Sequence, residues 1–290
     1  MRPSRSAVSA VTALGAAAAF ILVLAGPNAP ARAGTDSFLD AHLLVTWYGN
    51  PHSRHMGVLG ERTGAARAEA LQRQADAFAS VTAKRILPAY HLVAVVAQPT
   101  AGSDAKYRRR ESAAVMRALL DEARVYGFHL VLDIQPGHAS VADEVDALAP
   151  FLREPDVHLA LDPEFAMAAG QIPGRQIGSM RASEINAAVD RLDAIIIAHQ
   201  LPRKVLILHQ FTLGMLPDKA TIRPGQRVEL VLDMDGFGSQ SLKQASYRAI
   251  MRQRELDFAG VKLFYGQDRG LFSPAEVMRL KPVPAVVIYQ

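Results

Sequence analysis

The sequence predicts an α/β fold, a single (β/α)8 TIM barrel that follows an N-terminal signal peptide. Apolar runs of strand length alternate with segments of helical pattern along the chain. The runs are rich in Val, Ile and Leu, as in parallel strands that are covered on both faces. Eight such units in about 250 residues match the count and size of this barrel. An open doubly wound sheet is the alternative, but the first run leads into Tyr48-Gly49-Asn50-Pro51, which is not a glycine-rich phosphate turn.

The first 33 residues have the features of a signal peptide. Two early arginines precede an apolar stretch over 7–26, and residues 31–33 (Ala-Arg-Ala) fit the small-x-small cleavage rule. We therefore expect a signal peptide at 1–33, a barrel domain at 34–290, and a location outside the cell or on the exterior of its envelope. An uncleaved membrane anchor is the alternative, because the apolar stretch is nearly long enough to span a bilayer.

Charge and cysteine content exclude several classes of site. The whole chain has a formal net charge of +4, but the leader holds three arginines and no acid, which leaves 29 basic and 28 acidic residues after cleavage. A nearly neutral domain lacks the basic footprint of a nucleic-acid-binding protein, and we interpret the run 108–110 (Arg-Arg-Arg) as the solvated start of a helix. The absence of cysteine excludes disulfides and thiolate metal sites.

Eight strands are predicted, each followed by a spacer. They cover residues 43–48, 91–97, 128–133, 157–162, 205–210, 228–233, 261–265 and 285–289. The predicted helices cover residues 64–82, 107–126, 140–153, 182–200 and 240–258. Ser140 is a good N-cap, and Ser273 to Glu276 form a capping box that predicts a short helix. The spacer 212–225 contains prolines and glycine, which limits any helix there to one or two turns.

Three of these strands end in one repeated pattern, Leu-x-Leu-Asp-x-polar, at 130–135, 159–164 and 230–235. Side chains of a strand alternate between two faces, so the acid and the polar residue two positions later share a face. The paired residues are Asp133 with Gln135, Asp162 with Glu164, and Asp233 with Asp235. Because parallel strands of a barrel all end at the same mouth, the pattern predicts one shared site.

Other strand ends add polar groups at matching places. The candidates for substrate binding are Tyr48, Asn50, Gln98, Gln135, His209, Gln210, Tyr265, Asp268 and Tyr289. Amides, phenols, carboxylates and a histidine are the groups that hydrogen-bond hydroxyl-rich ligands. His129 and His158 lie earlier on their strands, and we interpret them as interior histidines with hydrogen-bond partners.

Glu164 is the candidate proton donor. It projects furthest beyond its strand, and Asp162 lies roughly 6.5 Å back along the same face. Crowded carboxylates raise at least one pKa, which keeps such an acid protonated near neutrality. Glycoside hydrolysis needs this donor and usually a second carboxylate, for which Asp162, Asp235, Asp233 and Asp133 are the candidates.

The segment Asp162-Pro163-Glu164 resembles the Asp-x-Glu motif of chitinase-type and muramidase-type TIM-barrel glycoside hydrolases. The resemblance implies that Glu164, at the end of the fourth strand, donates the proton. Chitinases also carry acids two and five residues before the aspartate, where this chain has Ala160 and Val157. Asp235, after Met234, only loosely resembles the Met-x-Tyr-Asp segment of chitinases.

Three functions are compatible with these residues. The leading hypothesis is a secreted, monomeric glycoside hydrolase that acts on a cell-wall or amino-sugar polysaccharide, with no cofactor, nucleic acid or membrane partner after cleavage. The second is a metal-dependent hydrolase of an ester or phosphodiester, with Asp133, Asp162, His209 and Asp233 as ligands. The third is a non-catalytic barrel that binds carbohydrate.

Overall fold

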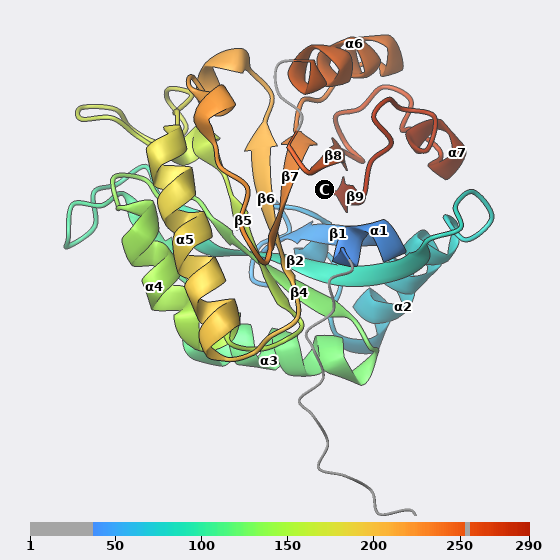
Figure 1. Cartoon of the computed structure of the whole chain (residues 1–290), viewed down its shortest axis with the longest axis horizontal. Coiled ribbons are helices and arrows are strands. Elements are labelled where there is room, and N and C mark those ends of the chain that lie inside the picture. Colours follow the sequence, from blue (N-terminus) through green and yellow to red (C-terminus); the bar gives the residue numbers. More distant parts are fainter. Residues whose placement is uncertain (1–36, 253–255) are drawn as a thin grey trace, which may run out of the picture. The chain divides into compact units, whose positions relative to one another are not determined.

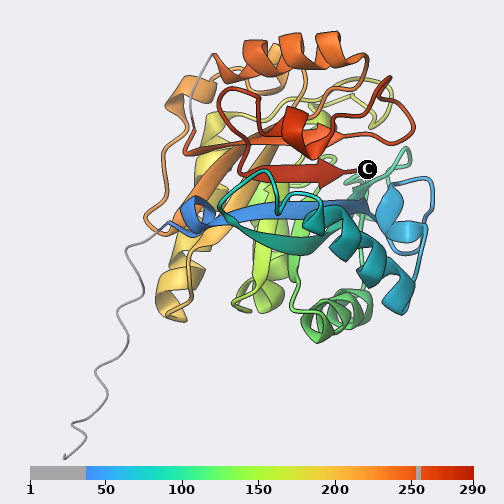
Figure 2. The same ribbon diagram turned by 90° about the vertical axis from the view of Figure 1, so that its right-hand side faces the viewer.

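The computed structural model describes residues 37–252 and 256–290, which form a closed barrel of parallel strands surrounded by helices (Figures 1 and 2). The barrel strands are β1 (His42–Gly49), β2 (Arg85–Ala97), β4 (His129–Ile134), β5 (Val157–Leu161), β6 (Lys204–Gln210), β7 (Val228–Met234), β8 (Phe258–Leu263) and β9 (Val286–Tyr289). Each strand pairs with its neighbours, and the pairing of β1 with both β2 and β9 closes the circle. The predicted eight-strand barrel is confirmed.

Helices follow most of the strands on the outside of the barrel. The longer ones are α2 (Gly64–Asp76), α3 (Ala113–Val125), α4 (Val141–Leu152), α5 (Ala182–Ala198) and α6 (Gln240–Met251). Three predicted ranges are too long, because α2 and α6 end several residues before 82 and 258 and α3 begins only at Ala113, after 107. Between β6 and β7 the chain forms only two single 3-10 turns, as the prolines there predict. In Figure 1, α4 and α5 lie side by side against the barrel.

Serine side chains define where several helices begin. Ser140 accepts a hydrogen bond from the Asp143 amide at the start of α4, as predicted. The capping box of Ser273 and Glu276 starts the single turn of α7 (Pro274–Val277). These bonds satisfy amide groups that have no partner within the helix.

The arginine run does not begin a helix. Residues 108–110 form β3, which pairs antiparallel with the end of β2. Arg108 Nε and Arg110 Nε donate to opposite oxygens of the Glu144 carboxylate, at 2.8 and 2.6 Å, and Glu144 is fully buried. The interpretation as a solvated helix start is therefore wrong, because two of the three arginines anchor this strand to α4.

Side chains fill the barrel interior, and the amino-terminal end is closed. The apolar side chains inside it include Leu44, Ala89, Val131, Ala160, Ile207, Val231 and Ile288, all buried. His158 Nδ1 accepts from the Val205 amide and His158 Nε2 lies 2.9 Å from His129 Nδ1, so both histidines have partners as predicted.

A short helix, α1 (Phe38–Ala41), covers that end of the barrel. The carboxylate of Glu229 accepts from the amides of Phe38 and Leu39, at 2.6 and 2.8 Å. The closed bottom leaves the carboxyl ends of the strands as the place for a site.

The predicted signal peptide and its cleavage position lie within residues 1–36, outside the described residues. In the part of the chain that the structure describes, no helix combines the length and apolar character needed to cross a membrane.

Candidate functional site

A cavity of about 700 Å³ opens at the carboxyl ends of the barrel strands. Its polar lining includes Asp162, Glu164, Asp235 and Lys262. Its walls include the aromatic side chains of Phe165, Phe211, Phe237 and Phe264. The volume falls within the range of about 300–1,000 Å³ that is usual for small-molecule sites.

The three Leu-x-Leu-Asp-x-polar segments converge on this mouth at two levels. Asp162, Glu164, Asp235 and Gln135 line the cavity. Asp133 and Asp233 are fully buried and do not line it. Because each pair comes from one strand, the residue two positions earlier lies deeper in the barrel. As catalytic candidates, Asp133 and Asp233 therefore have no direct access to a ligand in the cavity.

The turn that carries Glu164 is held by Asp162. Pro163 begins a single 3-10 turn over residues 163–165, and Asp162 Oδ1 accepts from the Glu164 amide at 3.2 Å. Gln135 Nε2 lies 3.3 Å from Asp162 Oδ2 and 3.3 Å from the Tyr48 hydroxyl. Asp162 thus bonds to Gln135 after β4, which in turn bonds to Tyr48 on β1, and it places Glu164, which is half-buried, at the cavity wall.

Lys262 is a cation in this acidic mouth that the sequence analysis missed. Its Nζ lies 3.2 Å from Asp235 Oδ1 and 3.6 Å from the centre of the Tyr48 ring. The residue is almost fully buried. The signal was present in the sequence, since a lysine inside an apolar strand needs a buried partner.

Burial and neighbouring charges shift the pKa values of the two acids on β5. Burial, reinforced by Asp133 and Asp235 and opposed by His209, raises the pKa of Asp162 to about 8. Burial and the Asp235 carboxylate raise the pKa of Glu164 above its ordinary value. Both acids therefore hold a proton to higher pH than a solvated carboxyl group does.

The charges of two basic groups are stabilised by the same carboxylates. Burial alone lowers the pKa of Lys262, but the nearby carboxylates, Asp235 first, outweigh it and raise that pKa. Burial likewise opposes the charged form of His209, and Asp133, Asp233 and Asp235 raise its pKa to about 9.

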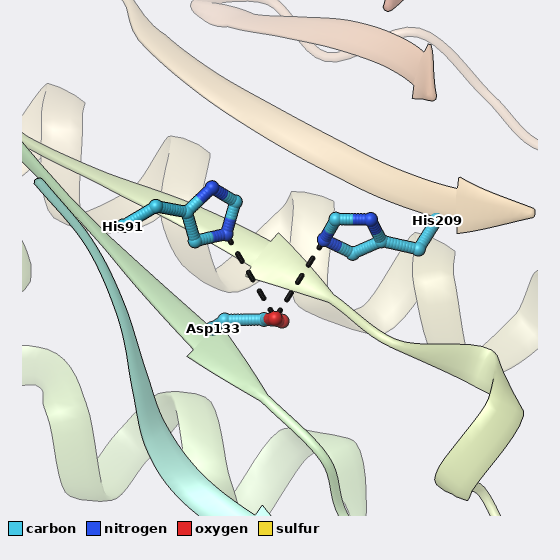
Figure 3. A group of neighbouring side chains, drawn as sticks. All are labelled: His91, Asp133 and His209. Carbon is cyan, nitrogen blue, oxygen red and sulfur yellow. Dashed lines mark ion pairs between the residues drawn. The ribbon is translucent and has the colours of Figure 1, made fainter. Parts of the chain in front are cut away.

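A buried polar cluster lies under the cavity floor. His209 Nδ1 lies 3.3 Å from Asp233 Oδ2, and His209 Nε2 lies 3.6 Å from Asp133 Oδ2. His91 Nε2 lies 3.8 Å from the same Asp133 oxygen (Figure 3). His209 was expected to bind substrate, but it is fully buried and does not line the cavity.

The position of His91 could not be predicted by counting back from Gln98. The register of β2 against β4 shifts between Val93 and Val95, which marks a bulge. In a regular strand, Gln98 and His91 would point to opposite faces, because they are an odd number of positions apart. The bulge adds one residue between them, so both side chains lie on the inner side of the barrel. Gln98 and Tyr48 do line the cavity, in the positions expected for substrate-binding residues.

Two predicted tyrosines lie outside the cavity. Tyr289 belongs to the outer face of β9 and stacks on Tyr265 with ring centres 5.5 Å apart. The Tyr265 hydroxyl donates to Gln74 on α2. Placing these tyrosines in the pocket was wrong, because inward residues of β9 alternate as Val286, Ile288 and then Gln290, which does line the cavity.

Three further predicted binding residues form hydrogen bonds or ion pairs away from the cavity. Gln210 accepts from Lys219 Nζ at 2.8 Å, on the face of β6 opposite to His209. Asp268 pairs with Lys243 Nζ at 2.6 Å and accepts from two loop amides. Asn50 donates to the buried Glu111 at 2.9 Å. None of the three lines the cavity, so their assignment to the pocket was wrong.

The predicted metal-ligand set is also changed by the structure. Among the described residues, two groups place potential ligand atoms within 4.8 Å of one another. They are His91 with Asp133 and His209, and His209 with Asp233 and Asp235. Asp162 belongs to neither group, because its carboxylate is turned to Gln135 and the Glu164 amide.

Comparison with known proteins adds only distant similarities. No protein-family description matches the sequence, and no curated protein matches it. Among solved structures, a GH18 chitinase from Pseudoalteromonas aurantia is similar with a TM-score of 0.43 and 11% identity, over 85% of this chain and 93% of that one. A UMP synthase from Leishmania donovani is similar with a TM-score of 0.38 and 13% identity, over 87% of this chain and 49% of that one. Both similarities are too low to carry an argument about function, which rests on the residues at the barrel mouth.

Proposed function

We propose that the protein hydrolyses glycosidic bonds of a polysaccharide, with Glu164 as the proton donor. The observation that carries this proposal is the position of Glu164 at the cavity wall, with a pKa raised by burial and by Asp235. A carboxylic acid that keeps its proton to higher pH than a solvated one is suited to protonate the leaving oxygen of a glycosidic bond. The resemblance of Asp162-Pro163-Glu164 to the Asp-x-Glu motif supports the same role.

Asp235 is the best placed partner carboxylate. It lines the same cavity, and Lys262 Nζ lies 3.2 Å from its Oδ1. A charged carboxylate at this position stabilises the positive charge that develops on the sugar ring, or activates a water molecule. Asp162, with a pKa raised to about 8, is a poor base at neutral pH and serves to position Glu164.

The aromatic walls support a carbohydrate ligand. Phe237 is 60% exposed, and Phe264 lies beside it with ring centres 5.8 Å apart. Sugar rings have apolar faces that pack on aromatic rings, while their hydroxyl groups bond to carboxylates and amides such as Gln98 and Gln135. With the predicted leader, these features favour a polysaccharide outside the cell or in its envelope.

The decisive experiment compares Glu164→Gln with the wild type on a panel of soluble and amino-sugar polysaccharides, with release of reducing ends as the readout. We expect a loss of about 100-fold or more in kcat, the usual contribution of a general acid. Glu69→Gln on α2 is the matched control, since Glu69 is exposed and remote from the cavity. Wild-type turnover by Glu164→Gln contradicts the assignment, and saturable glycan binding without turnover in the wild type replaces it with the non-catalytic barrel.

A further inference from the structure

Three fully buried side chains meet under the cavity floor, each from a different strand. His91 comes from β2, Asp133 from β4 and His209 from β6. Figure 3 shows the two imidazole rings on either side of the Asp133 carboxylate, each with Nε2 toward it. The distances to Asp133 Oδ2, 3.8 Å from His91 and 3.6 Å from His209, are too long for hydrogen bonds.

Both imidazoles have a second polar contact on the opposite nitrogen. Thr46 Oγ1 lies 3.4 Å from His91 Nδ1, and Asp233 Oδ2 lies 3.3 Å from His209 Nδ1. An imidazole that donates from Nδ1 to such an oxygen presents a lone pair at Nε2. This is the arrangement by which outer carboxylates and hydroxyl groups orient histidines that bind metal.

The atoms that face one another in this cluster are unsatisfied. Among the described residues, none meets hydrogen-bond geometry with His91 Nε2, His209 Nε2 or either oxygen of Asp133, although the Tyr48 hydroxyl is a neighbouring donor to Asp133. Leaving buried polar atoms unpaired is costly, and lone pairs opposite a carboxylate repel. A proton on His209 relieves only one of the two contacts and leaves His91 without a partner.

We propose that His91, Asp133 and His209 bind one divalent transition-metal ion beneath the cavity. Two imidazoles and a carboxylate without thiolate suit zinc and the neighbouring divalent metals better than calcium or magnesium. With His209 neutral as a ligand, Asp133, Asp233 and Asp235 oppose only the charge of Lys262, so a divalent ion takes the place of the His209 proton and balances the cluster. The alternative group around Asp235 is less suitable, because Lys262 already pairs with that carboxylate.

The ion has a structural role, because none of its three ligands lines the cavity. It joins β2, β4 and β6 inside the barrel and lies near Tyr48, whose ring centre is 5.0 Å from that of His91 and 6.0 Å from that of His209. The site is independent of the proposed hydrolysis, which uses Glu164 and Asp235.

The test uses the full chain, unfolded with chelator and refolded with or without one equivalent of Zn(II) or Co(II). We expect one bound ion per chain, visible d–d bands for Co(II), and a higher unfolding temperature with metal. His91→Gln and Asp133→Asn remove these signals, while Glu164→Gln and His129→Gln keep them. His129 is the matched control because it is an interior histidine at the other end of the barrel.

Thr46→Val provides a variant that leaves all three ligands in place. Loss of the contact to His91 Nδ1 weakens metal affinity by about 10–100-fold, the usual effect of an outer partner. Substoichiometric metal after refolding overturns the proposal, as does unchanged affinity in both His91→Gln and Thr46→Val. Glu164→Gln separates the two proposals, since it abolishes turnover if hydrolysis is correct and retains the ion if the metal site is correct.

Discussion

Lys262 Nζ and Asp235 Oδ1 lie 3.2 Å apart in the mouth of the barrel, and both residues are buried. Removing one partner of such a pair leaves the other charge without compensation. We expect Lys262→Met to lower the free energy of unfolding by about 3–5 kcal/mol at neutral pH. Urea unfolding measures the change, and Lys281→Met, at an exposed position, is the control.

The same variant has a pH signature. Acid adds protons to the buried carboxylates around Lys262, among them Asp162 and Asp233, whose pKa values burial raises, so the destabilisation by Lys262→Met becomes smaller as the pH falls toward 4. A destabilisation that is the same at pH 4 and pH 7 contradicts a charge effect and indicates lost packing on Tyr48 instead.

The raised pKa of Asp162 makes stability depend on pH. The folded state keeps the proton up to a pKa of about 8, whereas the unfolded chain releases it near the ordinary aspartate pKa of 3.8. The folded state thus binds more protons between these values, and stability falls as the pH rises through that window. Asp162→Asn has no proton to release, so its free energy of unfolding declines less steeply from pH 4 to 6.5, by up to about 1.4 kcal/mol per pH unit.

Measurements below pH 6.5 separate the effect of Asp162 on stability from the effect of His209. In the metal-free protein the pKa of His209 is raised from 6.5 to about 9, so its contribution is fully present below pH 6.5 and is lost only above it. Urea unfolding at several pH values between 4 and 6.5 gives the slope of the unfolding free energy against pH for the wild type and for Asp162→Asn. Equal slopes for wild type and Asp162→Asn contradict the raised pKa.

The anchoring of β3 by Glu144 predicts a large effect far from the cavity. Glu144 is fully buried and bonds to Arg108 and Arg110. We expect Glu144→Gln to cost about 3 kcal/mol of unfolding free energy, because two guanidinium groups lose their buried anion. The control is Asp146→Asn, which breaks an exposed pair with Arg191 and costs at most about 1 kcal/mol.

The barrel was predictable because its strands are continuous apolar runs, but details that depend on tertiary contacts were not. The start of β2 at Arg85 was missed, since Pro88 interrupts the strand pattern although its neighbours Leu87 and Ala89 are buried in the barrel. The arginine run was wrongly predicted to begin a helix, because Glu144, the buried anion that it binds, lies more than thirty positions along the chain.

The acids at the mouth were predictable for the same reason as the barrel. Period-two alternation placed Asp162, Glu164 and Asp235 on the inner face, and the structure brings these three to one cavity. The depth of each acid in the barrel was not predictable, because the repeated pattern does not show which acid of a strand reaches the cavity. Alternation holds at the end of β9, where Val286, Ile288 and Gln290 lie on the inner side, and Tyr289 was placed in the pocket only because it ends the strand.

We expect the aromatic side chains that line the cavity to contribute to ligand binding more than to the stability of the fold. Phe237 is 60% exposed and lines the cavity, so Phe237→Ala removes a packing surface for a sugar ring at little cost to the fold. We expect KM for a polysaccharide to rise about 10-fold, equivalent to roughly 1.4 kcal/mol of binding, with kcat nearly unchanged. Leu242→Ala is the control, because Leu242 is 53% exposed on α6 and does not line the cavity. Steady-state kinetics on the substrate identified with the wild type measure the effect, and an equal rise of KM in both variants contradicts a specific role for the Phe237 ring.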